Sequence, residues 1–228
     1  MNKIINNFFI AYFKYSNSSA VYVEEKTPKN MMASPVDEEG WYTWQPLKGT
    51  LNDIDYLKLE SRFDVKFPKS FLEWHKQYFF LDCSCQLMGL PTSSPTEPLQ
   101  QIIDNMDYSL AKDLIAAKLY PFGDEGNDAG PLVFDGRYEV ENNEYPIRVY
   151  DHEYGGDLEG LSEIIFSSFP KLLECFTHYI QELKSRKNFE IIPDFFHIDP
   201  TGAGKTGVDY WLGWVAMEKE NDELFGDN

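Results

Sequence analysis

The chain has 228 residues, 43% hydrophobic and 16% aromatic, and its 38 acidic and 20 basic residues give a formal net charge of −18. So many aromatic side chains, each able to bury roughly 150–250 Å², supply a substantial core and exclude global disorder. The charge argues against nucleic-acid binding, which needs lysine and arginine to displace counterions from phosphates. It favours encounter with a basic protein partner, although acidity that only maintains solubility is an open alternative.

Residues 1–40 predict an irregular segment with at most one helix or strand, at residues 4–15. The apolar run at residues 8–13 is short and lacks a following cleavage site with small residues, so we expect no signal peptide. No run approaches the ~20 apolar residues of a membrane span. The three cysteines show neither zinc-ligand spacing nor a disulfide framework. These features predict a cytoplasmic protein that does not associate with membranes.

Two helices are predicted next. In residues 53–62, acidic residues begin the segment and basic residues end it, which complements the helix dipole. Pro68 suits the first turn of a second helix. In that helix Phe71, Trp74 and Tyr78 recur at helical spacing, which predicts one aromatic stripe against the core.

The middle of the chain alternates between helical and strand patterns. Residues 91–98 predict a loop, and residues 102–117 predict one or two amphipathic helices. Strands are expected at residues 131–135 and 145–152, which are flanked by glycine, asparagine and proline. The strongest helical pattern lies at residues 170–186. This order of elements predicts an α+β fold in which helices cover a sheet.

Residues 189–198 and 208–217 are too apolar for a disordered tail, so we expect both to pack. Only residues 218–228 predict a solvated acidic end. Between these segments, TGAGKT at residues 201–206 is similar to part of a phosphate-binding loop. Asp199 stands where that loop has its first glycine, and its carboxylate would repel a phosphate. A glycine-rich turn between two strands is the simpler interpretation; nucleotide binding is retained as an alternative hypothesis.

No catalytic residue, metal ligand or cofactor is predicted. The four histidines lack the paired spacing of zinc sites, and no nucleophile elbow occurs. Asp151, His152 and Glu153 form a dense ionisable cluster. On a strand, however, Asp151 and Glu153 would share one face while His152 points to the other. The pattern therefore favours a charged strand edge over a ligand site.

Residues 120–163 contain 12 acidic and two basic residues, a net charge of −10. Acidic residues concentrated in neighbouring loops are what a face for a cationic partner requires, although a merely solvated face is the alternative. The predicted partner-binding residues are Asp124, Glu125, Asp128, Asp151, Glu153 and Asp157.

Four motifs follow one another over residues 48–183. They are LKLE, VKFP and FLEW (57–74), PFGDEG before LVFD (121–135), a strand ending in DHE (149–153), and a helix entered through SSF (167–169). In this order they resemble the SUKH superfamily, which includes fungal cell-wall synthesis regulators and the bacterial Syd protein. The Asn-Gly-Gly that usually follows the aromatic helix is replaced here by YFFLD at residues 78–82.

The resemblance implies a single mixed, mostly antiparallel sheet packed against helices, and no catalysis. It also implies a domain at residues 48–187. Residues 1–47 and 188–228 have no counterpart in the minimal domain, so they are expected to be an N-terminal extension and a C-terminal extension, and the apolar residues of the second predict that it packs on the domain and ends in an acidic tail. Bacterial members are largely immunity proteins that bind toxins, often nucleases, and an acidic protein suits a basic nuclease site. We therefore expect a non-enzymatic immunity protein with a basic toxin domain as partner; the alternative is a regulatory interaction scaffold.

Overall fold

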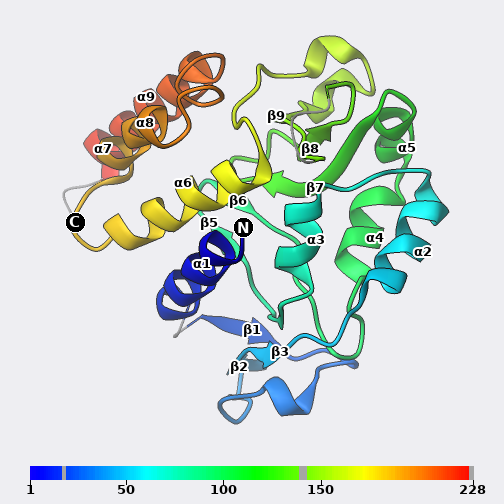
Figure 1. Ribbon diagram of the computed structural model, residues 1–228. Helices are drawn as coiled ribbons and strands as arrows, with labels where there is room; N and C mark the ends of the chain where they lie inside the picture. Colours follow the sequence, from blue (N-terminus) through cyan, green and yellow to red (C-terminus); the bar gives the residue numbers. More distant parts are fainter. Residues whose placement is uncertain (17–18, 139–142, 226–228) are drawn as a thin grey trace.

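The computed structural model describes residues 1–16, 19–138 and 143–225 (Figure 1). Its main sheet has five antiparallel strands in the order β5 (Ser84–Cys85), β6 (Met88–Gly89), β7 (Leu119–Glu125), β8 (Pro131–Asp135) and β9 (Ile147–Val149). Two antiparallel pairs lie outside it: β1 (Ala20–Tyr22) with β2 (Trp41–Thr43), and β3 (Leu47–Lys48) with β4 (Tyr78–Phe79). The α+β class is confirmed.

The sheet differs in two details from the single mixed sheet that was expected. The strands are divided among three sheets, and every described pairing is antiparallel. Short turns join β5 to β6 and β7 to β8, and a short turn can join only antiparallel strands. The first five residues of the PFGDEG segment lie in strand β7, which has an irregularity between Pro121 and Gly123.

Strands β7 and β8 are buried on both faces, which explains their nearly continuous apolar sequences. On one face, Leu119 and Val133 form a small cluster with Leu114 of α5 (Ser109–Ala116). On the other face, Phe122 and Phe134 stack with ring centroids 3.8 Å apart. Helix α4 (Gln100–Met106) also packs on β7, so two helices occupy residues 102–117, one of the two arrangements predicted there.

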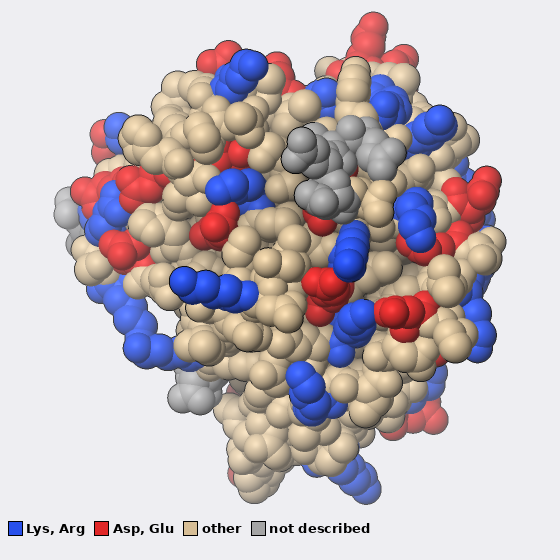
Figure 2. Space-filling model, viewed as in Figure 1, with Lys and Arg blue, Asp and Glu red and all other residues tan. Residues whose placement is uncertain are grey.

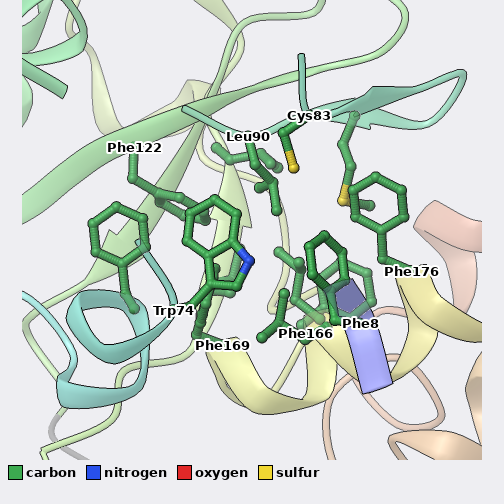
Figure 3. Close-up of a cluster of buried hydrophobic side chains, with 14 of the residues drawn as sticks. Phe8, Trp74, Cys83, Leu90, Phe122, Phe166, Phe169 and Phe176 are labelled. Atoms are coloured by element: carbon green, nitrogen blue, oxygen red, sulfur yellow. The ribbon is translucent and has the colours of Figure 1, made fainter. Parts of the chain in front are cut away.

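An aromatic core joins helices from distant parts of the sequence. Helix α1 (Asn2–Tyr15) packs along α6 (Phe169–Glu182), and both face α3 (Lys69–His75). Phe8 of α1 contacts Trp74 of α3 and Phe176 of α6 edge-on, at centroid distances of 6.0 and 5.4 Å (Figure 3). Residues 4–15 are thus helical and central to the core, because their aromatic side chains occupy one helix face.

Helix α2 (Asp53–Phe63) begins at a capping box formed by Asn52 and Asp55, as the acidic first turn suggested. It ends at Asp64, which adopts a left-handed conformation with φ of 54°. Helix α3 ends at His75, so Tyr78 does not extend its aromatic stripe, contrary to prediction. The carbonyl of Trp74 accepts a hydrogen bond from Gln77, and the chain turns there into β4.

The C-terminal segment forms α7 (Asn188–Ile191), α8 (Phe195–Ile198) and α9 (Val208–Phe225), which lie together beside α6 (Figure 1). Two expectations about it were wrong. Residues 201–206 join two helices, not two strands. Residues 218–225 belong to α9 and are not a wholly solvated end, because Glu218 is buried and Asp222 pairs with Lys187, the residue before α7.

One hydrophobic core includes residues from α1, the sheet, α6 and α9, so it crosses the expected boundaries near residues 47 and 187. The division into a domain and two extensions stays a prediction. Both edges of the main sheet are covered, which removes sites for unwanted strand pairing. Tyr12 of α1 bonds the backbone of Ser84 in β5, and residues 161–166 pair with the β9 edge. Of the helices described, none has the length and apolar character to cross a membrane.

Candidate partner-binding face

The predicted acidic residues lie at one end of the sheet. Asp124 and Glu125 end strand β7, and Asp128 lies in the loop between β7 and β8. Asp151, Glu153 and Asp157 lie in the loop of residues 150–160 after β9. The amide of His152 donates a hydrogen bond of 3.0 Å to the carbonyl of Ala129, which connects the two loops. Five of the six predicted side chains are exposed or half-exposed: Asp124, Asp128, Asp151, Glu153 and Asp157. Glu139 and Glu141 of the same acidic stretch lie outside the described residues.

The segment from Asp151 to Glu153 is not a strand, so the strand-edge interpretation was wrong. Strand β9 ends at Val149, and Asp151 accepts a hydrogen bond of 3.0 Å from the amide of Glu153. This contact caps a 3-10 turn, because a short aspartate side chain competes well for nearby backbone amides. Asp157 caps a second such turn through the amide of Glu159. Capping by Asp151 and Asp157 therefore stabilises two tight turns within the loop of residues 150–160.

Glu125 has a different environment from the other five residues. Its side chain is buried, and one carboxylate oxygen accepts hydrogen bonds from the amides of Asn127 and Ala129, at 2.7 and 3.2 Å. The other oxygen accepts a hydrogen bond from the hydroxyl of Tyr210 at 3.2 Å. With both oxygens engaged internally, Glu125 shapes the β7–β8 turn and does not face a partner.

Three exposed hydrophobic residues border the same loops and were missed by the sequence reasoning. Tyr108, Tyr154 and Leu158 are 38%, 49% and 47% exposed. Helix α5 closely approaches the second loop, because a side chain at Gly156 would lie 3.4 Å from Cβ of Asp113. Isolated aromatic residues in polar segments have no periodic signal, so only the folded chain shows that they lie beside acidic side chains.

The pKa values reflect this crowding of negative charge. Partial burial, and then the charge of Asp128, raise the pKa of Asp124. Burial, and then the charge of Asp124, raise the pKa of Tyr108. In both cases burial is the larger cause and the neighbouring negative charge is the smaller one.

The two basic residues of the acidic stretch both bind one buried carboxylate within the fold. Arg137 and Arg148 both bind the fully buried carboxylate of Asp135, at 2.7 and 2.8 Å. Burial alone would raise the pKa of Asp135, but the hydrogen bond and charge of Arg137 outweigh it and hold the pKa below its usual value. The surface acids are therefore not offset by these arginines. The face in front in Figure 2 carries basic and acidic side chains in mixture.

The backbone amides of the TGAGKT loop bind the carboxylate of Asp199, which precedes the loop in the sequence. Asp199 is fully buried and accepts hydrogen bonds from the amides of Gly202 and Ala203 at 3.1 and 3.3 Å. It also binds the amide and hydroxyl of Ser167, at 2.7 and 2.6 Å. The amides that would hold a phosphate thus already bind a carboxylate. A side chain at Gly202 would lie 2.2 Å from the Ser167 nitrogen, so packing requires this glycine.

The three cysteines and the buried His75 are not part of the acidic face. Burial raises the pKa of Cys85 to about 12 and those of Cys83 and Cys175 well above the usual value, so these thiols stay protonated. His75 is buried and bonded to the hydroxyl of Tyr56 at 2.8 Å. Within the described part of the chain, histidine, cysteine and carboxylate side chains form no group of three or more that could hold a metal ion.

No protein-family model matches this sequence, and a search of the curated proteins finds no match.

Proposed function

We propose that this chain is a non-enzymatic cytoplasmic binding protein whose acidic face binds a basic protein partner. We define the acidic face by the exposed side chains of Asp124, Asp128, Asp151, Glu153 and Asp157. The observation that carries the proposal is the joining of two acidic loops by the His152–Ala129 hydrogen bond, while both local arginines bind the buried Asp135. A surface with a single sign of charge steers an oppositely charged partner toward it and accelerates association.

The exposed hydrophobic residues beside the acidic face favour a protein partner over a small cation. Interfaces concentrate binding energy in a few residues, among which tyrosine is enriched, and surround them with polar residues. Tyr108, Tyr154 and Leu158 supply such anchors next to the acidic side chains. A partner arginine can form an ion pair with a carboxylate and also stack on a tyrosine ring.

The resemblance to the SUKH superfamily supports a more specific form of the proposal. On that basis the partner is a basic toxin domain, and the chain is an immunity protein that occludes it. An acidic protein can occupy a nuclease site by presenting carboxylates where the phosphates of the substrate bind. Binding of this kind requires no catalytic group on the chain itself.

The test is capture of a partner by the tagged full chain from its native host at low salt. The face variant is D128N/E153Q/D157N, and the matched control E38Q/E39Q/E220Q removes the same charge from exposed acids elsewhere. We expect the wild type and the control to capture one basic protein, and the face variant to bind it at least about tenfold more weakly. Raising the salt from 50 to 200 mM should weaken wild-type binding.

Two results would overturn the proposal: capture of no partner by the wild type, or equal losses in the face variant and the control. A toxin gene beside the gene for this chain would support the immunity role. Many weak partners and no neighbouring toxin gene would instead favour the regulatory scaffold.

A further inference from the structure

We propose that Tyr210 of α9 is a positioning residue, which holds the β7–β8 turn in the conformation that places Asp128 on the acidic face. The importance of that conformation for binding rests on the proposed function. The stabilisation of the turn by Tyr210 does not depend on a partner and is a property of the fold. It acts through Glu125, the one predicted partner-binding residue whose carboxylate is buried.

Glu125 connects the turn to the helix. One carboxylate oxygen accepts hydrogen bonds from the amides of Asn127 and Ala129, the residues on either side of Asp128. The other oxygen accepts a hydrogen bond from the hydroxyl of Tyr210. Burial, and then the charge of Glu125, raise the pKa of Tyr210 well above its usual value, so the hydroxyl keeps the proton that it donates.

Helix α9 makes further contacts with the same end of the sheet. Nε1 of Trp214 donates a hydrogen bond of 3.1 Å to the Tyr210 hydroxyl, which fixes its orientation. One turn further on, Sδ of Met217 lies 3.0 Å from Nδ2 of Asn127. Glu218 accepts hydrogen bonds from Gln86 in the neighbouring β5–β6 turn, at 2.8 and 2.9 Å. One face of α9 thus contacts both turns.

Two residues give the β7–β8 turn an uncommon backbone conformation that its hydrogen bonds must select. Asp128 has a φ of 59°, in the left-handed region that, after glycine, asparagine and aspartate adopt most readily. Gly130 has a φ of 142°, and a side chain there would lie 2.3 Å from the carbonyl of Tyr150. The bonds to Glu125 favour this conformation, and Tyr210 orients the carboxylate that makes them. Without it, alternative turn conformations become populated.

The test is amide hydrogen exchange, followed by NMR, in the full chain and its Tyr210→Phe variant, which lacks only the hydroxyl. We expect exchange at Asn127 and Ala129 to accelerate by at least about tenfold, because local opening becomes more populated. Tyr22→Phe on strand β1 is the matched control and should leave both rates unchanged. Global unfolding in urea separates this local effect from a general loss of stability. Unchanged rates at both amides in Tyr210→Phe would overturn the proposal.

A double-variant comparison tests whether Tyr210 acts through Glu125. Glu125→Gln replaces one accepting oxygen with a donor and should also accelerate exchange at Asn127 and Ala129. Adding Tyr210→Phe to Glu125→Gln should accelerate it little further, since residues that act through one contact are not additive. If the accelerations of exchange in the two single variants multiply in the double variant, Tyr210 does not act through Glu125. Failure of the wild type to capture a basic partner would overturn the proposed function but not the role of Tyr210. Hydrogen exchange tests that role in the isolated chain, without any partner.

Discussion

Two regions of the molecule are held together by different kinds of interaction. Around Trp74, rings from α1, α3, α6 and β7 pack with almost no polar contact; Trp74 and Phe169, for example, have centroids 5.4 Å apart (Figure 3). At the C-terminal helices and the loop ends of the sheet, buried carboxylates connect distant segments. Glu125 bonds Tyr210, and Asp199 bonds Ser167.

The difference teaches which interactions determine which level of structure. Apolar packing is non-directional, so it selects the elements and the faces that they bury. A buried carboxylate must satisfy its hydrogen bonds with specific donors, so it selects individual loop conformations. Glu144 is a further example: it accepts hydrogen bonds from the amide and hydroxyl of Ser70 at the start of α3. Through Glu125, the β7–β8 loop is positioned by a contact of this second kind.

The largest effect is expected in the aromatic core. Trp74→Ala should lower the free energy of unfolding by about 3–5 kcal/mol, because it removes a fully buried ring and leaves a cavity. Urea denaturation followed by circular dichroism measures this loss. Trp41→Ala is the control, since Trp41 is 43% exposed and should cost less than about 1 kcal/mol. Equal losses at the two positions would contradict a central role for this ring.

Asp199→Asn tests the carboxylate that closes the TGAGKT loop. The amide keeps the shape of the side chain but replaces one accepting oxygen with a donor that faces donors. We expect a loss of about 2–3 kcal/mol in the free energy of unfolding. Glu220→Gln on the exposed face of α9 should change stability by less than about 0.5 kcal/mol. A loss below about 1 kcal/mol for Asp199→Asn would show that the loop does not depend on its charge.

The buried His75 should make the aromatic core sensitive to pH. Burial lowers the pKa of His75 to about 4, whereas an unfolded histidine titrates near 6.5. Between these values the unfolded state binds more protons, so stability falls as the pH falls from about 6.5 to 4. We expect His75 to account for a loss of about 2 kcal/mol between pH 7 and pH 5. His75→Phe should reduce this pH dependence; an unchanged profile would contradict the assignment.

The smallest stability change is expected on the acidic face. Asp128→Asn and Glu153→Gln each replace an exposed carboxylate in a crowd of like charges. We expect changes in the free energy of unfolding within about 0.5 kcal/mol, with a tendency toward stabilisation at low salt. Urea denaturation at 20 and 200 mM salt measures this. A loss above about 1 kcal/mol would assign these acids a structural role like that of Glu125.

Patterns of local sequence predicted many elements well. Helix α2 was predicted from the acidic and basic residues at its two ends, and α6 from the apolar stripe of residues 170–186. Both signals depend only on residues that are neighbours within one helix. Tyr78 shows the limit, since a stripe in the sequence does not show where a helix stops. The sequence did not show that Asp128 is exposed and Glu125 buried, because both lie in one acidic segment. The environment of Glu125 depends on Tyr210, which is 85 residues away in the chain.

The amino-acid sequence by itself determined the α+β class, the acidic balance and its concentration in residues 120–163, since these follow from composition and short-range periodicity. Only the tertiary structure decided that α1 completes the core, that Asp199 occupies the glycine-rich loop, and that α9 contacts the turn carrying Asp128. Each of these depends on hydrogen bonds or packing between segments far apart in the chain, for which a local pattern carries no signal.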